Sequence, residues 1–360
     1  GSIAVAMIEA DTLDITAGSS VSIVEKDDVV VNSLNLNIGF AYVDLRAGGN
    51  ITLNDDLSVT NSASITLYAG NDGSGSLTVN KALTTASGAI TLTAGSGMTL
   101  SEQADLTTTS GDVILNAGTG ALTMTGETVI NAGSGLIDID AGGDIILGKL
   151  RTTNVNPLVI TSTGGAVLDG GDSLTDIIAT GARLVINAAN GVGSGIYGAV
   201  ETEVASLQIT NSNVASNGAV AIEDVNALDV EKIDQRGTGA VSIRTVNGPM
   251  VVKETGISAT SGAVTLYAGG QTASRFDLNA YIKTTGGSVS ITTDSGDITF
   301  SKGIEVLGAG NITLLAPQGA IVNDPTAVGW LLKNGSFSPE IEWAMINGRF
   351  SVNEDTGQIL

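Results

Sequence analysis

The stretch SGAITLTAG, from Ser87 to Gly95, is one copy of the phrase Ser-x-x-(Ile/Val)-x-(Leu/Ile)-x-Ala-Gly. Four more copies follow the same pattern: SASITLYAG (62–70), SGDVILNAG (110–118), SGLIDIDAG (134–142) and SGAVTLYAG (261–269). Aligning Ile65, Ile90, Val113 and Ile137 gives steps of 25, 23 and 24 residues. A fixed period of this size is typical of a solenoid, in which each repeat stacks on the next.

The phrase itself predicts a β-strand. Ile65, Leu67 and Ala69 alternate with Ser64, Thr66 and Tyr68. This is the period of two expected of a strand with one face turned inward. A second set of strands begins with glycine and interleaves with the first: GNITL (49–53), GSLTV (75–79), GALTM (120–124) and GDIIL (143–147). A third, weaker set carries Leu57, Leu83, Leu106 and Val129. Three short strands in about 24 residues predict the coil of a parallel β-helix.

The same register returns at Val241, Val264, Val289 and Ile312, so the predicted domain is a parallel β-helix over residues 1–324. Between the two regular parts, a glycine-rich stretch predicts an irregular loop near residues 189–204. After Asp324 the composition changes, and four of the chain's twelve aromatic residues fall within 325–360. We interpret 325–360 as an aromatic-rich C-terminal cap, because the open end of a solenoid exposes strand edges and apolar core.

Composition excludes several classes of function. The formal charge is −22, and the 15 Lys and Arg residues are scattered, so no basic stripe is present for nucleic acid. Cys and His are both absent, which removes disulfides, thiolate metal sites and imidazole catalysis. No segment reaches the roughly 18 consecutive apolar residues of a membrane span. The first residues, GSIAVAMIEADTL, lack the basic region of a signal peptide and are expected to be a mature or excised end.

The repeats also resemble a known family. The five phrases, the NGVGSG loop, the ETEVASLQI segment and the run containing GAVAI, GAVSI and NGPMVV (218–252) resemble the stalk repeats of very large bacterial surface adhesins of the filamentous haemagglutinin type, over about residues 12–324. This resemblance implies a right-handed β-helix that is exported to the bacterial cell surface and takes part in attachment. The family's Asn-Pro-Asn-Gly secretion motif is not visible, and Asn156-Pro157-Leu158 is not that motif. We therefore expect an interior or C-terminal portion, or a shorter relative.

Acidic clusters are the first candidates for chemistry, since some β-helical proteins cleave acidic polysaccharides with grouped carboxylates and a cation. Asp55 and Asp56 follow a strand and are interpreted as turn-capping residues. Asp138 and Asp140 would project from one strand face, with Asp144 close behind, and paired carboxylates of this kind raise each other's pKa or hold a cation. Without a nearby cationic stabiliser they form half of a catalytic site, and a solvated exterior is the preferred interpretation.

Two weaker signals concern ligands. LDGGDSLTD (168–176) resembles half of a calcium repeat, but it occurs once and lacks the central glycine. Tyr68 and Tyr267 occupy equivalent outward positions, as aromatic residues do on sugar-binding faces, although surface filling is the preferred interpretation.

The sequence thus predicts no catalytic, cofactor-binding or metal-binding residue and no cofactor. The leading hypothesis is a non-enzymatic, extracellular stalk segment of a bacterial surface adhesin, with cell-surface or matrix components, glycans among them, as partners. One alternative is a subunit that assembles end to end into an extracellular filament or sheath, with neighbouring copies as partners. Another is a polysaccharide-binding or polysaccharide-cleaving β-helix protein. Nucleic acid is not an expected partner, and the chain is not expected to span a membrane.

Overall fold

The chain is an all-β protein whose parallel coils form a β-solenoid of about 13 turns, with about 23 residues per turn, close to the predicted 24. The computed structural model describes residues 2–36, 42–70, 73–125, 127–171, 174–193, 198–271, 274–323, 331–333 and 342–343. The chain divides into two compact units, Gly1–Ala182 and Arg183–Leu360. None of the described residues belongs to a helix that is long and apolar enough to cross a membrane. The right-handed sense of the coil stays a prediction.

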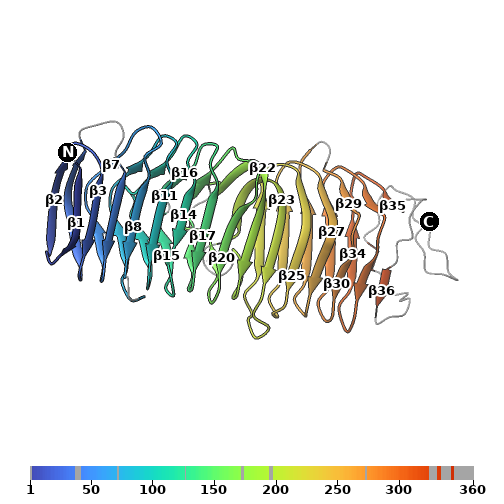
Figure 1. Ribbon diagram of the computed structural model, residues 1–360. Helices are drawn as coiled ribbons and strands as arrows, with labels where there is room; N and C mark the ends of the chain where they lie inside the picture. Colours follow the sequence, from blue (N-terminus) through green and yellow to red (C-terminus); the bar gives the residue numbers. More distant parts are fainter. Residues whose placement is uncertain are drawn as a thin grey trace. The chain divides into compact units, whose positions relative to one another are not determined.

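In the first unit, three stacks of parallel strands run through successive coils, and the strands of each stack lie side by side (Figure 1). The first stack contains the quoted phrases: β1 (Ile3–Ile8), β3 (Val21–Glu25), β5 (Val43–Ala47), β8 (Ile65–Ala69), β11 (Ile90–Ala94), β14 (Val113–Asn116), β17 (Ile137–Ala141) and β20 (Leu158–Ser162). The second stack contains the glycine-led strands: β2 (Thr12–Ala17), β4 (Val29–Leu36), β6 (Ile51–Leu53), β9 (Leu77–Val79), β12 (Met98–Leu100), β15 (Leu122–Met124), β18 (Ile145–Ile146) and β21 (Val167–Leu168). The third stack contains the shortest strands: β7 (Leu57–Ser58), β10 (Leu83–Thr84), β13 (Leu106–Thr107), β16 (Val129–Asn131), β19 (Lys149–Arg151) and the start of β22 (Ile177–Ala188).

The second unit repeats the arrangement with longer strands. One stack again contains four five-residue strands followed by two shorter ones: β24 (Val220–Asp224), β26 (Val241–Thr245), β28 (Val264–Ala268), β31 (Val289–Thr293), β34 (Ile312–Leu315) and β37 (Glu342–Trp343). The long strands are β23 (Val200–Asn211), β25 (Leu228–Gln235) and β27 (Met250–Ala259). Two series of short strands continue from β27: β29 (Phe276–Leu278), β32 (Ile298–Phe300) and β35 (Ile321–Asn323), then β30 (Ile282–Thr284), β33 (Ile304–Val306) and β36 (Leu331–Lys333).

The predicted alternation is confirmed by burial. Ile65, Leu67 and Ala69 are at most 1% exposed, and each pairs with the equivalent residue of β11. Successive side chains of a strand point to opposite faces, so the aliphatic residues all point to one face. On that face the aliphatic residues of one coil stack on those of the next coil and fill the interior. The core is therefore a set of aliphatic columns.

The third strand set is shifted by one residue at a single place. Leu57, Leu83 and Leu106 pair as predicted, but the next member of the column is Ile130 and not Val129. Thr128 and Ile130 are both buried, with Val129 between them on the opposite face, so the inward position falls one residue later than predicted.

Two predicted irregular segments are described only in part. β23 begins at Val200, inside the loop predicted near 189–204, and residues 194–197 lie outside the described residues. In the predicted cap, 325–360, the backbone pairs again at β36 and β37. The other residues of that segment lie outside the described ones.

Candidate functional site

The first pair of acidic candidates serves the backbone. The carboxylate of Asp56 accepts a hydrogen bond from the backbone N–H of Ala82 at 3.0 Å, and that of Asp55 accepts one from Leu34 at 2.9 Å. Each carboxylate therefore satisfies a backbone donor in a neighbouring coil, that of Ala82 in a turn and that of Leu34 within β4.

The members of the second acidic cluster do not all lie on one strand, because Asp144 falls in the turn after β17. Asp138 and Asp140 both project outward from β17, and burial, together with the nearby Asp140, raises the pKa of Asp138. Asp144 lies in the turn, where its carboxylate accepts the backbone N–H of Ala166 at 2.8 Å. Lys149, the nearest cation in sequence, pairs with Glu127 at 3.1 Å. The three aspartates thus do not converge with a cation on one point.

The segment with the calcium-like pattern brings two carboxylates together. Asp169 and Asp176 are both buried, and a carboxylate oxygen of each lies within 4.8 Å of the other. Asp169 also accepts the backbone N–H of Gly171 at 3.0 Å. A Ca²⁺ ion takes about six to eight oxygen ligands, so this pair supplies only part of such a site. Asp172 and Ser173 lie outside the described residues.

The two outward tyrosines share a kind of partner, an arginine, that was not foreseen from the sequence. The guanidinium of Arg46 lies 5.9 Å from the ring centre of Tyr68, and that of Arg244 lies 5.3 Å from the ring centre of Tyr267. In each case the arginine is the register partner of the tyrosine in the preceding coil. The signal was present, since VDLRA precedes ITLYA and VSIRT precedes VTLYA by one period.

Tyr267 differs from Tyr68 in having a carboxylate next to it. Its hydroxyl donates to one oxygen of Asp294, whose other oxygen accepts the backbone N–H of Gly270 at 3.0 Å. This hydrogen bond to Asp294 raises the pKa of the Tyr267 hydroxyl, because it favours the protonated form. At the position equivalent to Asp294, the first unit has Gly95.

Beside this pair is a hollow of about 400 Å³, which we call the Tyr267 hollow. Three successive turns of the second unit form its walls, and it is lined by Gly270, Gln271, Asp294, Ser295, Pro317 and Gln318. Ser295 is held in place by hydrogen bonds to the buried Ser274, at 2.7 Å through its backbone N–H, and to the Gly270 carbonyl, at 3.0 Å through its hydroxyl. The lining thus offers a carboxylate that is oriented by hydrogen bonds and two exposed carboxamides.

A second polar group, the Glu231 ion cluster, contains Arg183, Gln208, Asp229, Glu231 and Lys253. The nearly buried Glu231 carboxylate pairs with Arg183 at 2.7 Å and accepts from the Gln208 amide at 3.0 Å, and Lys253 pairs with Asp229 at 2.6 Å. The hydrogen bond to Asp229 raises the pKa of Lys253. Acid and cation therefore meet here, at residues that the sequence analysis did not single out.

Two bulges create the Glu231 ion cluster. Leu207 pairs with Val230 while Gln208 pairs with Lys232, so Glu231 is an extra residue in β25. Opposite it, β27 carries further extra residues, including Glu254 with a φ of 58°. Each charged side chain of this cluster is matched by one of opposite sign, so the bulged backbone carries no uncompensated buried charge there.

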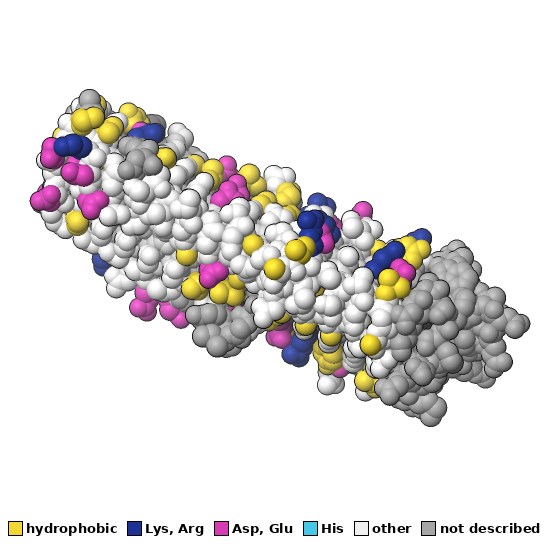
Figure 2. Space-filling model, turned by 90° about the horizontal axis from the view of Figure 1, so that it is seen from below, with side chains coloured by type: hydrophobic (Ala, Val, Ile, Leu, Met, Phe, Trp, Pro, Cys, Tyr) yellow, Lys and Arg dark blue, Asp and Glu magenta, His cyan; other side chains and the backbone are white. Residues whose placement is uncertain are grey.

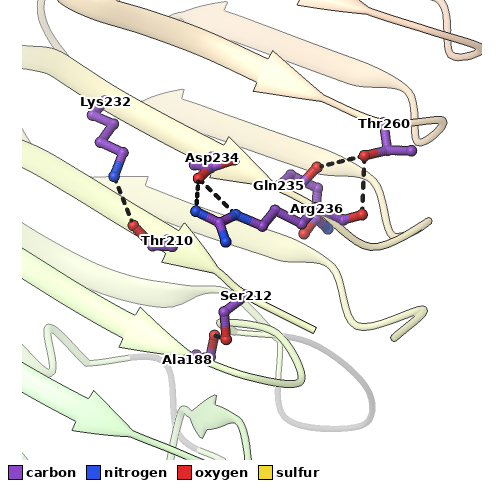
Figure 3. A network of polar contacts seen from close by, with 8 residues as sticks. All are labelled: Ala188, Thr210, Ser212, Lys232, Asp234, Gln235, Arg236 and Thr260. Carbon is purple, nitrogen blue, oxygen red and sulfur yellow. Dashed lines mark hydrogen bonds and ion pairs between the residues drawn. The ribbon is translucent and has the colours of Figure 1, made fainter. Parts of the chain in front are cut away.

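Smaller polar contacts tie neighbouring coils together, as Figure 3 shows for β23, β25 and the turn after β27. Lys232 donates to the Thr210 hydroxyl at 3.0 Å, and the Thr260 hydroxyl donates to the Arg236 carbonyl at 2.9 Å. Arg236, directly after the end of β25, pairs with Asp234 in that strand. Figure 2 shows one face of the molecule. On this face the charged side chains lie in small groups, which are separated from one another by uncharged surface.

The columns of paired strands and the polar turns define the chain as a β-solenoid repeat protein. No protein-family model, curated protein or solved structure matches the chain.

Proposed function

We propose that this chain is a non-enzymatic structural segment of a large bacterial surface adhesin, of the kind its repeats resemble. In this role the solenoid acts as a stalk outside the cell and contributes to contact with other cells, surfaces or matrix. The observation that carries the proposal is the unbroken parallel pairing of strands from coil to coil within each unit. Such pairing spreads a load over many backbone hydrogen bonds.

The arrangement of acidic side chains supports the non-enzymatic part. The carboxylates of Asp56, Asp112 and Asp144 accept backbone N–H groups of the next coil, at 3.0, 2.8 and 2.8 Å. Those of Asp229 and Glu231 are paired with cations. Carboxylates engaged in this way stabilise the fold and are poorly placed to act as general bases.

Location is tested with an antibody raised against the chain. Intact source cells should be labelled as strongly as permeabilised ones, because the proposal places the solenoid outside the cell. An antibody against a cytoplasmic protein serves as the control for membrane integrity. Labelling that requires permeabilisation would overturn the extracellular stalk.

Mechanical function is tested by stretching the chain between two marker domains in a single-molecule force experiment. Coils should detach one or a few at a time, and with about 23 residues per turn each coil should release roughly 80 Å of chain, at up to about 3.6 Å per residue. Extension at a force below that of the marker domains, without steps, would argue against a load-bearing stalk.

A further inference from the structure

The Tyr267 hollow has the features of a built binding site. Its volume of about 400 Å³ falls in the range of about 300 to 1,000 Å³ that is usual for small-molecule pockets. It lies on three consecutive turns, which follow the paired strands β28, β31 and β34.

Asp294 is the central group of the hollow. Its two oxygens accept from the Tyr267 hydroxyl and from the Gly270 N–H, which orient the carboxylate from both sides. A carboxylate has about four acceptor positions, so each oxygen keeps capacity for a further donor. Tyr267 acts here as a positioning residue for Asp294, because its hydroxyl donates to the carboxylate. Arg244 lies over the Tyr267 ring.

The lining selects the chemistry of the ligand. A carboxylate together with the carboxamides of Gln271 and Gln318 matches a molecule that presents several hydroxyl groups as donors and acceptors. An anionic ligand is disfavoured by Asp294 and by the net charge of −22. The guanidinium of Arg244 is already paired with Glu223 at 3.1 Å.

We propose that the Tyr267 hollow binds a neutral saccharide, with Asp294, Gln271 and Gln318 as the groups that contact its hydroxyls. This inference deepens the proposed attachment role and rests on it for its biological setting. The saccharide site itself requires only the second unit's three turns.

The test uses the full chain on an array of immobilised neutral hexose and N-acetylhexosamine oligosaccharides, with sialylated and sulfated ones beside them. The best-bound oligosaccharide is then titrated by calorimetry. Asp294→Asn and the double variant Gln271→Ala/Gln318→Ala should each weaken binding at least tenfold. The matched control is Tyr68→Phe against Tyr267→Phe, since Tyr68 has the same kind of arginine partner but Gly95 in place of Asp294. Only Tyr267→Phe should lower the affinity.

Three results would overturn the saccharide site: no neutral oligosaccharide is retained, sialylated or sulfated ones are preferred, or the hollow variants bind as well as the unmodified chain. Thermal unfolding of each variant identifies a loss of fold, and the exposed Gln271 and Gln318 keep the test valid if Asp294→Asn is unstable. Failure of saccharide binding leaves the surface labelling and stepwise extension intact. Conversely, binding with no surface labelling would overturn the stalk proposal alone.

Discussion

At the scale of single residues, the position of a side chain on its strand decides its effect on stability. Leu115 is 1% exposed and belongs to an inward column, whereas its neighbour Ile114 is 38% exposed on the outward face. Two adjacent residues of similar size thus face different surroundings, and the comparison isolates burial from chemistry.

Leu115→Asp should unfold the first unit or destabilise it by about 4 kcal/mol or more, because it buries an unpaired carboxylate among aliphatic side chains. Ile114→Asn, which adds no charge opposite its register partner Asp138, should change stability by less than about 1 kcal/mol. Urea unfolding followed by circular dichroism measures both. Equal midpoints for the two variants would show that the inward register is wrong.

Asp224 is a buried acid inside the second unit. Its carboxylate accepts from the Thr202 hydroxyl at 2.8 Å and from the backbone N–H groups of Val204 and Asn226 at 3.1 and 2.9 Å. Burial nevertheless dominates and, with a contribution from Glu203, raises the pKa of Asp224 from 3.8 to about 6. The folded chain therefore holds this proton more tightly than the unfolded chain does.

The pH dependence follows from that difference. Because the folded pKa lies above the unfolded one, the stability from Asp224 is fully present below pH 3.8, decreases as the pH rises through about 6, and is constant above it. Relative to Asp224→Asn, the unmodified chain should lose about 2 kcal/mol between pH 4.5 and 7.5, as estimated from 1.36 kcal/mol per pKa unit. Urea midpoints at several pH values measure this loss. A constant difference between the two proteins would contradict it.

Other buried polar residues illustrate what the sequence does not reveal at this scale. Thr108, Thr245 and Thr293 are inward and buried, and each hydroxyl donates to the carbonyl of a glycine three residues later. The Thr-x-x-Gly spacing is visible in the sequence. The spacing predicts this hydrogen bond only if the threonine is known to face inward. For a polar residue, alternation alone does not say which face of the strand it occupies.

At the scale of the strand and its turn, there is a physical reason for the glycine at the second position of the repeated phrase. A Cβ atom on Gly111 would lie 1.9 Å from the carbonyl oxygen of Gly88, and one on Gly135 would lie 2.0 Å from that of Gly111. In the second unit, Gly262 and Gly287 have the same relation to the coil before them. The glycines thus form a ladder in which the backbones of successive coils approach too closely for a side chain.

Gly111→Ala should therefore destabilise the first unit by about 2 kcal/mol or more, because the obstructing atoms belong to backbone and cannot rotate away. Gly181→Ala is the matched control: Gly181 is exposed, and the nearest atom to its Cβ is a methyl carbon of Val155 at 3.4 Å. It should be neutral or slightly stabilising. Thermal unfolding distinguishes the two, and equal melting temperatures would refute the close approach.

Regular strands could be predicted from the sequence, and irregular ones could not. The columns that contain Ile65 and Val264 follow from alternation and a fixed period, because both signals repeat. The bulges at Glu231 and Glu254 occur once each and shift charged residues together. A single insertion carries no periodic signal, so the Glu231 ion cluster stayed hidden. The Tyr267 hollow was missed for a related reason, since its walls come from three turns of dissimilar sequence.

At the scale of the whole molecule, net charge controls how copies of the chain interact. Acidic residues number 37 and basic residues 15, so the chain carries −22 at pH 7 and has a pI near 4.1. Like charges repel, so this net charge should oppose association of copies through exposed apolar side chains such as Met7 and Val155.

Lowering the pH toward 4.1 should remove this repulsion and produce self-association, detected as a rise in scattered light and in hydrodynamic radius over a concentration series at low salt. Protonation of Asp224 favours the folded state at this pH, and far-ultraviolet circular dichroism measures whether the fold persists. The control is 1 M salt at pH 7, where screening to about 3 Å should also promote association without any change in protonation. Association under both conditions identifies charge as the barrier, and electron microscopy of the product separates ordered end-to-end filaments from amorphous aggregates. A chain that stays monodisperse at pH 4 with its fold intact would mean that charge repulsion is not what keeps copies apart.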